Sequence, residues 1–277
     1  MKRIILILLI VMGTVAIGIR VLGASAGRAL LGMSSVRTSS FQVSSARSLQ
    51  SMRFLSAPIV DGDLSDWLAG DRINLDRYTA FSYSGNIDSP ADLSAIIRSA
   101  WDEQTLYFAI EVNDDVRVTD GPDLWRDDGV EVALDGLNDK NAWGEDDHQY
   151  SIVADGSTFD RSVPITSIVA SVLTYEGGYS IEVAIPMAEL IPGVPISGTV
   201  MGFTVGLRDD DDGGDWDAYL IWEGTNTSGA PEEFGSLVFT ERLEDRIDAL
   251  EARIIQLEQK LDELLQILSE FEGLPPP

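Results

Sequence analysis

Two acidic segments of the chain contain the residue types of a cation site. The first is Asp61-Gly62-Asp63, and the second is Asp209–Asp212. Ca²⁺ takes roughly six to eight oxygen ligands, and carboxylates on loops commonly supply them. The second segment does not follow the EF-hand pattern, because Gly213 and Leu220 stand at that loop's fifth and twelfth positions. We predict a structural calcium site of another type, with these candidate ligands: Asp61, Asp63, Asp209 and Asp211.

The overall composition excludes several kinds of chemistry. The 277 residues include no Cys and a single His, His148, which rules out disulfides, thiolate zinc sites and Cys nucleophiles. The 46 acidic and 19 basic residues give a net charge of −27, so nucleic acid is not an expected partner. We expect no redox cofactor. No pattern places two carboxylates across a cleft, as glycoside hydrolysis requires, so we predict no enzymatic activity. A solvated surface suited to high salt is the alternative explanation for the acidic residues.

The N-terminal segment has the pattern of an export signal. Lys2-Arg3 precede the apolar run Ile4–Ile19, and Ala24-Ser25-Ala26 offers a small-residue cleavage site. We predict that residues 1–26 are a signal peptide, or a retained N-terminal anchor, and that the protein is secreted or lies at the cell surface. Residues 27–56 contain nine Ser, four Arg and no acid. This composition predicts a basic linker able to contact an anionic membrane or cell wall, with a plain spacer as the alternative.

Residues 57–240 have the pattern of one all-β domain. Short runs rich in Val, Ile, Tyr and Phe alternate with clusters of Gly, Asp, Asn and Pro. The pattern predicts an antiparallel β-sandwich. The expected strands are Ala95–Trp101, Thr105–Val112, Val130–Asp135, Gln149–Ala154, Ile168–Tyr175, Tyr179–Ile185, Val200–Leu207, Ala218–Trp222 and Ser236–Thr240.

Residues 241–272 carry a heptad repeat. Apolar residues recur at alternating steps of four and three: Leu243, Ile247, Leu250, Ile254, Leu257, Leu261, Leu264, Leu268 and Phe271. Ile at the a positions with Leu at the d positions favours a parallel dimer, and Arg246 would face Glu251 of the second chain. A trimer or larger bundle, or a helix folded back on its own domain, are the alternatives. Residues 273–277 form a Pro-rich tail that cannot continue the helix.

Five segments in chain order carry a family resemblance. They are PIVDGDLSDW at 58–67, WDEQTLYFA at 101–109, WRDDGVE at 125–131, GYSIEVAIP at 178–186 and GFTVGLRDDD at 202–211. In these segments the chain resembles the family 9 carbohydrate-binding modules, extracellular β-sandwiches of jelly-roll type that belong to the wider DOMON-like set. The resemblance covers residues 57–240.

The resemblance implies a saccharide site. In sugar-binding members two Trp side chains enclose the sugar ring, and a Glu six residues after the first Trp accepts hydroxyl hydrogens. Trp125, Glu131 and Trp222 match these three positions, and Gln149 and Tyr219 stand where the family has further polar contacts. Aromatic faces beside a few polar groups suit a pyranose, which has apolar faces and a hydroxyl rim. Core packing is the alternative for Trp222, which ends an apolar strand.

We therefore predict an exported, non-catalytic carbohydrate-binding protein that forms a homo-oligomer and supports carbohydrate catabolism by partner glycoside hydrolases. One alternative is a structural surface or envelope protein that uses the same fold for protein contacts. Another is a redox subunit that binds haem b, as some DOMON-like relatives do. Its axial ligands would come from four residues: His148, Met187, Met201 and Lys140.

Overall fold

The computed structural model describes residues 46–67, 70–161 and 167–272. The predicted signal or anchor at 1–26, the first part of the predicted linker and the tail at 273–277 lie outside the described residues. Within the described ranges, no helix has the length and apolar character needed to cross a membrane.

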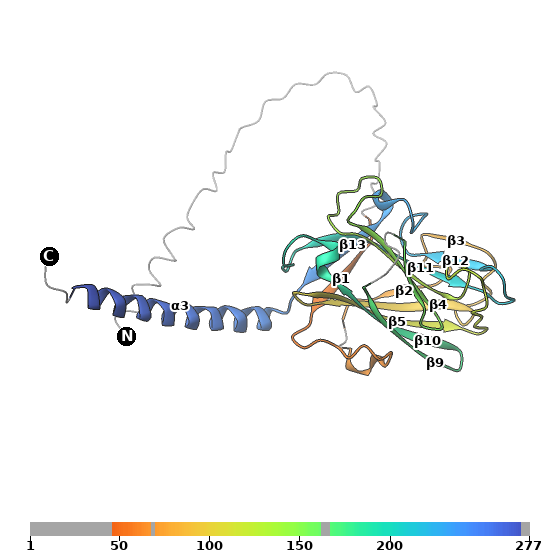
Figure 1. The fold of residues 1–277 in the computed structure, drawn as a ribbon. Helices are drawn as coiled ribbons and strands as arrows, with labels where there is room; N and C mark the ends of the chain where they lie inside the picture. Colours follow the sequence, from red (N-terminus) through yellow and green to blue (C-terminus); the bar gives the residue numbers. More distant parts are fainter. Residues whose placement is uncertain (1–45, 68–69, 162–166, 273–277) are drawn as a thin grey trace, which may run out of the picture. The chain divides into compact units, whose positions relative to one another are not determined.

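The described residues form a mostly β domain followed by one long helix (Figure 1). The strands are β1 (Ser48–Arg53), β2 (Ile73–Leu75), β3 (Ser82–Ser84), β4 (Leu93–Trp101), β5 (Thr105–Asp114), β6 (Gly129–Asp135), β7 (Asp147–Val153), β8 (Thr158–Asp160), β9 (Val169–Tyr175), β10 (Gly178–Pro186), β11 (Val200–Asp209), β12 (Ala218–Ile221) and β13 (Gly235–Thr240). The helices are η1 (Leu64–Asp66), α2 (Met187–Leu190), η2 (Pro231–Glu233) and α3 (Leu243–Glu272). All nine predicted strands are confirmed.

The strands pair in the order β8-β7-β6-β11-β13-β1-β4-β5-β10-β9, with β12 beside β11, β3 beside β12, and β2 beside β4. The sheet folds into two facing layers because apolar side chains alternate toward one core. Phe108 of β5 stacks on Phe203 of β11, with ring centroids 5.3 Å apart, across the two layers. Strands β13 and β1 join the layers, and Trp101 stacks on Phe239 at this junction, with centroids 5.1 Å apart. The predicted sandwich is confirmed.

The prediction of a linker over residues 27–56 was wrong for its last part, which contains a strand. Strand β1 lies within it and pairs in parallel with both β13 and β4. Leu49 is fully buried, and the Arg47 carbonyl accepts a hydrogen bond from Ser236 N at 2.9 Å. The segment is too short and too polar to show a clear strand pattern by itself. Its place becomes fixed only when β13 and β4 offer their free edges on either side.

The opening segment at 58–67 covers the outer face of β10. Glu182 of β10 is buried and accepts hydrogen bonds from Gly62 N at 2.8 Å and from Trp67 Nε1 at 2.7 Å. Gly62 has φ of +90°, and an added Cβ would lie 2.9 Å from Leu173 N, so both conformation and space require glycine there. This part of the family pattern is therefore structural.

The predicted helix at 241–272 is confirmed as α3, whereas its assembly into a coiled coil is not tested. Its heptad side chains from Leu243 to Leu264 are each about half-exposed or more. An isolated helix gains nothing from such an apolar row in water. The row is therefore available to a second helix.

Candidate functional site

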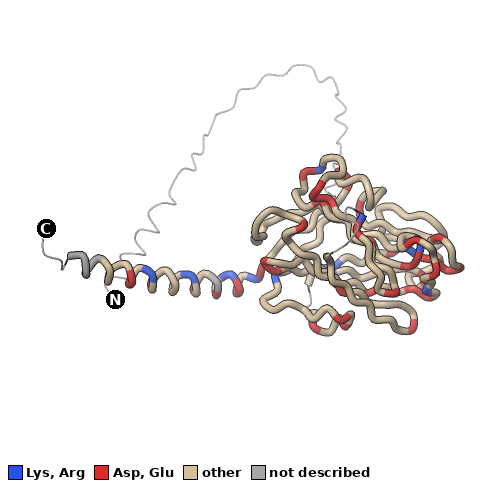
Figure 2. The backbone as a smooth tube through the Cα atoms, in the orientation of Figure 1, with Lys and Arg blue, Asp and Glu red and all other residues tan. Residues whose placement is uncertain are grey.

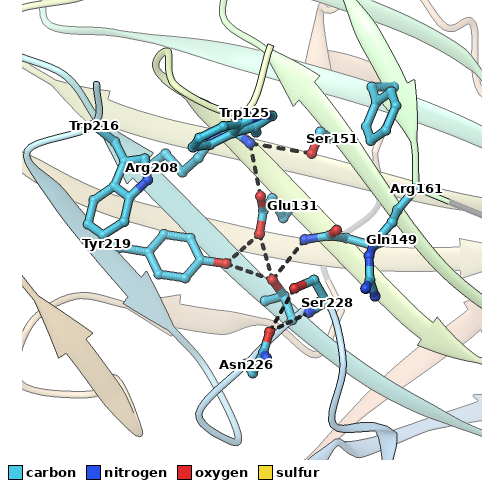
Figure 3. A pocket seen from close by; sticks show the side chains of 12 residues that line it. Trp125, Glu131, Gln149, Ser151, Arg161, Arg208, Trp216, Tyr219, Asn226 and Ser228 are labelled. Atoms are coloured by element: carbon cyan, nitrogen blue, oxygen red, sulfur yellow. Dashed lines mark hydrogen bonds and ion pairs between the residues drawn. The ribbon is translucent and has the colours of Figure 1, made fainter. Parts of the chain in front are cut away.

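A pocket of about 350 Å³ opens on the outer face of the layer that contains β6 and β11 (Figure 3). Side chains on a strand alternate between faces, so Val130 and Val132 point to the core while Glu131 points outward. The same alternation brings outward residues of neighbouring strands together. The pocket is lined by Trp125, Glu131, Gln149, Ser151, Phe159, Arg161, Arg208, Trp216, Tyr219, Asn226, Thr227 and Ser228.

Glu131 is the centre of the pocket's hydrogen-bond network. Its Oε1 is 2.9 Å from Arg208 Nη1 in a buried ion pair. Its Oε2 accepts from Thr227 Oγ1 at 2.6 Å and from the Tyr219 hydroxyl. Gln149 Nε2 donates to Thr227 Oγ1 at 2.9 Å. The carboxylate is thus held in one orientation by three neighbours, as a group that must orient a ligand requires.

Arg208 is held beneath the pocket floor by β6 and β7. Its Nε donates to the Asp127 carbonyl at 3.2 Å, and Nη1 also reaches Ser151 Oγ at 3.3 Å. Gly129 pairs with Arg208 across the two strands, and an added Cβ there would lie 2.7 Å from Arg208 Nη2. Arg208 Nη2 is buried and has no hydrogen-bond partner among the described residues.

The Tyr219 hydroxyl reaches the Glu131 carboxylate because Gly206 of β11 leaves room for the Tyr219 ring. A Cβ on Gly206 would lie 2.8 Å from Tyr219 Cζ, so any larger residue would displace the ring. Burial, followed by the nearby Glu131 carboxylate, raises the pKa of Tyr219 well above its usual value. The phenol therefore stays protonated and donates to the network at any physiological pH.

Two tryptophans form the aromatic wall of the pocket. Trp125 is 44% exposed, and the Arg126 guanidinium lies 4.3 Å from its ring centroid. Trp216 packs against Tyr219, with ring centroids 5.8 Å apart, and lies near Trp125 (Figure 3). Both side chains offer apolar surface next to the Glu131 network.

The structure does not bring Trp222 into this pocket, which corrects that prediction. Trp222 is 5% exposed and packs on Phe203 in the core, with centroids 5.5 Å apart. Outward Tyr219 and inward Leu220 set the alternation of β12, and this alternation turns Trp222 inward. The other four predicted residues, Trp125, Glu131, Gln149 and Tyr219, lie together in the pocket, and their contact with a sugar stays a prediction.

The sequence interpretation missed Arg208, Thr227, Arg161 and the place of Trp216. Arg208 has a readable signal, because the alternation of apolar residues at Phe203, Val205 and Leu207 places this charged residue on the outward face of its strand. Thr227 and Trp216 lie on loops, where no periodicity predicts which residues meet.

Carboxylates gather at the end of the domain where β5 and β11 end and β6 begins (Figure 2). Asp114, Asp128 and Asp209 are buried, and one carboxylate oxygen of each lies within 4.8 Å of the others. Both oxygens of Asp114 and of Asp209 have no hydrogen-bond partner among the described residues. Buried oxygens without donors are costly unless a cation or protons neutralise them. The set therefore fits a Ca²⁺ ion, which prefers carboxylate oxygens.

Burial raises the pKa values of the three aspartates in this cluster. Burial, as the largest cause, raises the pKa of Asp114 to about 7 and that of Asp128 to about 8. Burial and then the neighbouring Asp211 raise the pKa of Asp209 to about 8. A bound divalent cation would favour the ionised forms instead.

The predicted ligands Asp61 and Asp63 are not part of any carboxylate group in the described residues. Asp61 Oδ1 accepts from Asp63 N at 2.9 Å, and Asp63 Oδ1 accepts from Ser65 N at 3.0 Å to cap η1. This pair therefore shapes the turn before the helix, as Asx side chains commonly do. The structure therefore gives no support to these two as calcium ligands. Asp209 lies in the buried cluster, and Asp211 in a more exposed group with two other aspartates, Asp92 and Asp115.

The residues considered as haem ligands have other contacts. His148 Nδ1 lies 3.1 Å from Asp160 Oδ2, and Lys140 Nζ donates to the Phe234 carbonyl at 2.8 Å. Met187 and Met201 are packed in the core. These contacts give no support to an axial-ligand role.

The two-layer fold with an open polar and aromatic pocket defines a β-sandwich binding domain. The sequence profile described as "Carbohydrate family 9 binding domain-like" matches residues 67–242. The chain therefore belongs to this family, whose members are non-catalytic binding domains.

The relatives include much longer enzymes. Endo-1,4-beta-xylanase A of Thermotoga neapolitana is 30% identical over 185 residues, which are 65% of this chain and 17% of the enzyme. Exoglucanase XynX of Acetivibrio thermocellus is 27% identical over 192 residues, which are 66% of this chain and 16% of that protein. The chain thus spans about a sixth of the length of these relatives.

Solved structures with the same fold include a family 9 carbohydrate-binding module from Caldicellulosiruptor kristjanssonii in complex with cellotriose. Its TM-score is 0.61 at 22% identity, covering 71% of this chain and 95% of that one. The structure in complex with glucose gives 0.61 at 23% identity, covering 71% and 97%. At this identity the likeness establishes the fold alone.

Proposed function

We propose that the protein is a non-catalytic saccharide-binding protein and that its pocket centred on Glu131 is the binding site. The observation that carries the proposal is the combination of two partly exposed tryptophans, Trp125 and Trp216, with a fixed carboxylate between several hydroxyl and amide groups. An aromatic face packs on the C–H face of a pyranose, while the carboxylate and Gln149 accept from or donate to its hydroxyls. The complexes of the Caldicellulosiruptor kristjanssonii module with cellotriose and glucose agree with this ligand class.

Calorimetric titration of the full chain with glucose, cellobiose, xylobiose and cellotriose tests the proposal. Replacing Trp125 or Trp216 with Ala should weaken binding by at least about tenfold, because each removes apolar surface from the sugar face. The matched control is Tyr78→Ala, since Tyr78 is an exposed aromatic residue that also packs against an arginine, Arg77, but does not line the pocket. Equal affinity of all three variants would refute the assignment of the site. No binding to any sugar would favour the structural surface protein.

A structural Ca²⁺ at Asp114, Asp128 and Asp209 is part of the proposal. Asp128 precedes Gly129 of β6, and Asp209 follows Arg208 of β11, so the cluster lies next to the strands that support the pocket. Asp128 Oδ2 also accepts from Val118 N at 2.5 Å, which ties down the loop leading to Trp125. A cation there would hold the loop and both strand ends in place. Chelation should therefore weaken sugar binding as well as stability.

We further propose that α3 joins two copies in a parallel coiled coil. The exposed heptad row of Leu and Ile supports this, as does the arrangement of Arg246 and Arg253 opposite glutamates of the second helix. Two tethered pockets bind a polysaccharide more tightly than one when both can engage it. Export to the cell surface, and cooperation with glycoside hydrolases there, complete the proposed role.

A further inference from the structure

The pocket has the opposite charge balance to the rest of the protein. The chain carries a formal charge of −27, yet the pocket lining, as far as the structure describes it, contains two arginines and one acid. Glu131 is already neutralised by Arg208, whose Nη1 lies 2.9 Å from its Oε1. The remaining charged side chain in the lining is Arg161. The pocket therefore presents a net positive charge to its ligand.

Arg161 is placed to contact a ligand. It follows β8, and its backbone N donates to the Gln149 carbonyl at 3.1 Å, which fixes its position beside that pocket residue. Its guanidinium lies 4.8 Å from the centroid of the Trp143 ring, a contact that orients the group, and the guanidinium N–H groups donate to none of the described residues. Among the residues that the structure describes, Arg161 has no ion-pair partner, whereas Arg126 pairs with Asp215 at 2.9 Å.

Figure 3 shows Arg161 on the Gln149 side of the pocket, across from Tyr219 and Trp216. A sugar ring packed on the tryptophans would therefore direct one edge toward Glu131 and another toward Arg161. A guanidinium binds a carboxylate or a sulfate with paired N–H donors in a geometry that a neutral hydroxyl cannot match.

From this charge and geometry we infer that the preferred ligand is an acidic saccharide, whose anionic substituent binds Arg161 while its ring occupies the aromatic wall. This inference rests on the proposed saccharide site. The negative field of the whole domain opposes an anionic ligand only weakly at such short range, because charges beyond about 8 Å are screened at physiological ionic strength. The contact between the anionic substituent and the Arg161 guanidinium acts at hydrogen-bond distance, and its attraction therefore outweighs this repulsion.

Titration of the full chain with three matched sugars tests the inference: glucose, glucuronic acid and glucose 6-sulfate. At low salt the acidic sugars should bind about fivefold tighter than glucose, the strength of a partly exposed charged pair. A preference for glucuronic acid alone would identify a carboxylate as the substituent, and a preference for both acidic sugars would show that any anion at this position suffices. The preference should shrink as NaCl is raised, because the pair is partly exposed.

Three variants distinguish a specific contact between the ligand and Arg161 from a general effect of positive charge on the domain. Arg161→Gln should abolish the preference for the acidic sugars over glucose, and Arg161→Lys should retain part of that preference. Arg72→Gln removes the same charge from an exposed site outside the pocket and should leave the preference intact. Equal binding of neutral and acidic sugars, or a preference that survives Arg161→Gln, would overturn the inference and leave the saccharide site standing. Failure of every sugar to bind would overturn both.

Discussion

Glu131 of β6 and Arg208 of β11 form a buried ion pair, 2.9 Å between Oε1 and Nη1, directly beneath an open pocket. Glu131 pairs with Gly206 across the two strands, so the arginine reaches the carboxylate diagonally from two residues further along β11. A buried pair of this kind is weak evidence for stability in itself, but removal of one partner leaves an uncompensated charge. Both the stability of the fold and the position of the carboxylate in the pocket therefore depend on this ion pair.

Replacing Arg208 with Met should lower the free energy of unfolding by about 3–5 kcal/mol and abolish sugar binding, because Glu131 would remain buried without its cation. Urea unfolding and calorimetric titration measure the two effects. The double variant Glu131→Met with Arg208→Met should recover much of the stability and none of the binding. If the double variant is as unstable as the single one, the pair is not the cause.

Stability in chelator should fall as the pH rises from about 5 to about 8. The buried carboxylates of Asp114, Asp128 and Asp209 have pKa values of about 7 to 8 in the folded protein and ordinary values when unfolded. The folded state thus binds more protons over this range, so the slope of unfolding free energy against pH is negative there. Thermal unfolding in EDTA at pH 5.5 and at pH 8 measures this loss of stability.

Calcium should reverse this loss, because it replaces the protons on the same carboxylates. Its effect on the melting temperature should be larger at pH 8 than at pH 5.5. Asp209→Asn should reduce the calcium effect, and the matched variant Asp61→Asn should leave it unchanged. An equal response in both variants would place any calcium outside the buried cluster.

Replacing Gly206 with Ala should weaken sugar binding about tenfold or more, since the new Cβ would force the Tyr219 ring away from Glu131. The tyrosine must then leave a hydrogen-bonded, partly buried position, so the melting temperature should also fall. Gly70→Ala is the control, because a Cβ there meets no atom within 4 Å. Unchanged sugar affinity in Gly206→Ala would show that Tyr219 does not position the carboxylate.

Substitution of Trp222 should mainly lower the stability of the fold, whereas substitution of Trp216 should mainly lower the affinity for sugar. Trp222→Ala should cost about 3–5 kcal/mol of unfolding free energy, because it leaves a large cavity beside Phe203. Trp216→Ala should cost only about 1 kcal/mol while removing binding, since Trp216 is partly exposed on a loop. Urea unfolding with titration distinguishes them. The reverse pattern would restore Trp222 as the second wall of the site.

The coiled-coil proposal predicts a change of mass on substitution of a d-position leucine. Leu257→Asp should convert the dimer to monomer in analytical ultracentrifugation, because it places charges in the apolar seam. The β domain and its sugar affinity per chain should be unaffected. Glu258→Gln on the neighbouring e position is the mild control. A wild-type chain that sediments as a monomer would contradict the proposal.

The sequence by itself determined nine of the described strands, the long helix and the family. Alternation with a period of two and a repeat of seven are local patterns, and they record which face of each element is apolar. The family resemblance, not these patterns, pointed to Trp125, Glu131, Gln149 and Tyr219 as site residues.

Only the tertiary structure decided which of these residues share a site. It turned Trp222 into the core and brought Trp216 to the pocket, because strand register and loop paths depend on contacts distant in sequence. It also gave Glu131 its partner, 77 residues away, and brought together Asp114, Asp128 and Asp209 from three strand ends. Asp61 and Asp63 had the composition of ligands, but their carboxylates are used by their own turn. Residue type sets what a side chain can do, and the packing of strands sets what it meets.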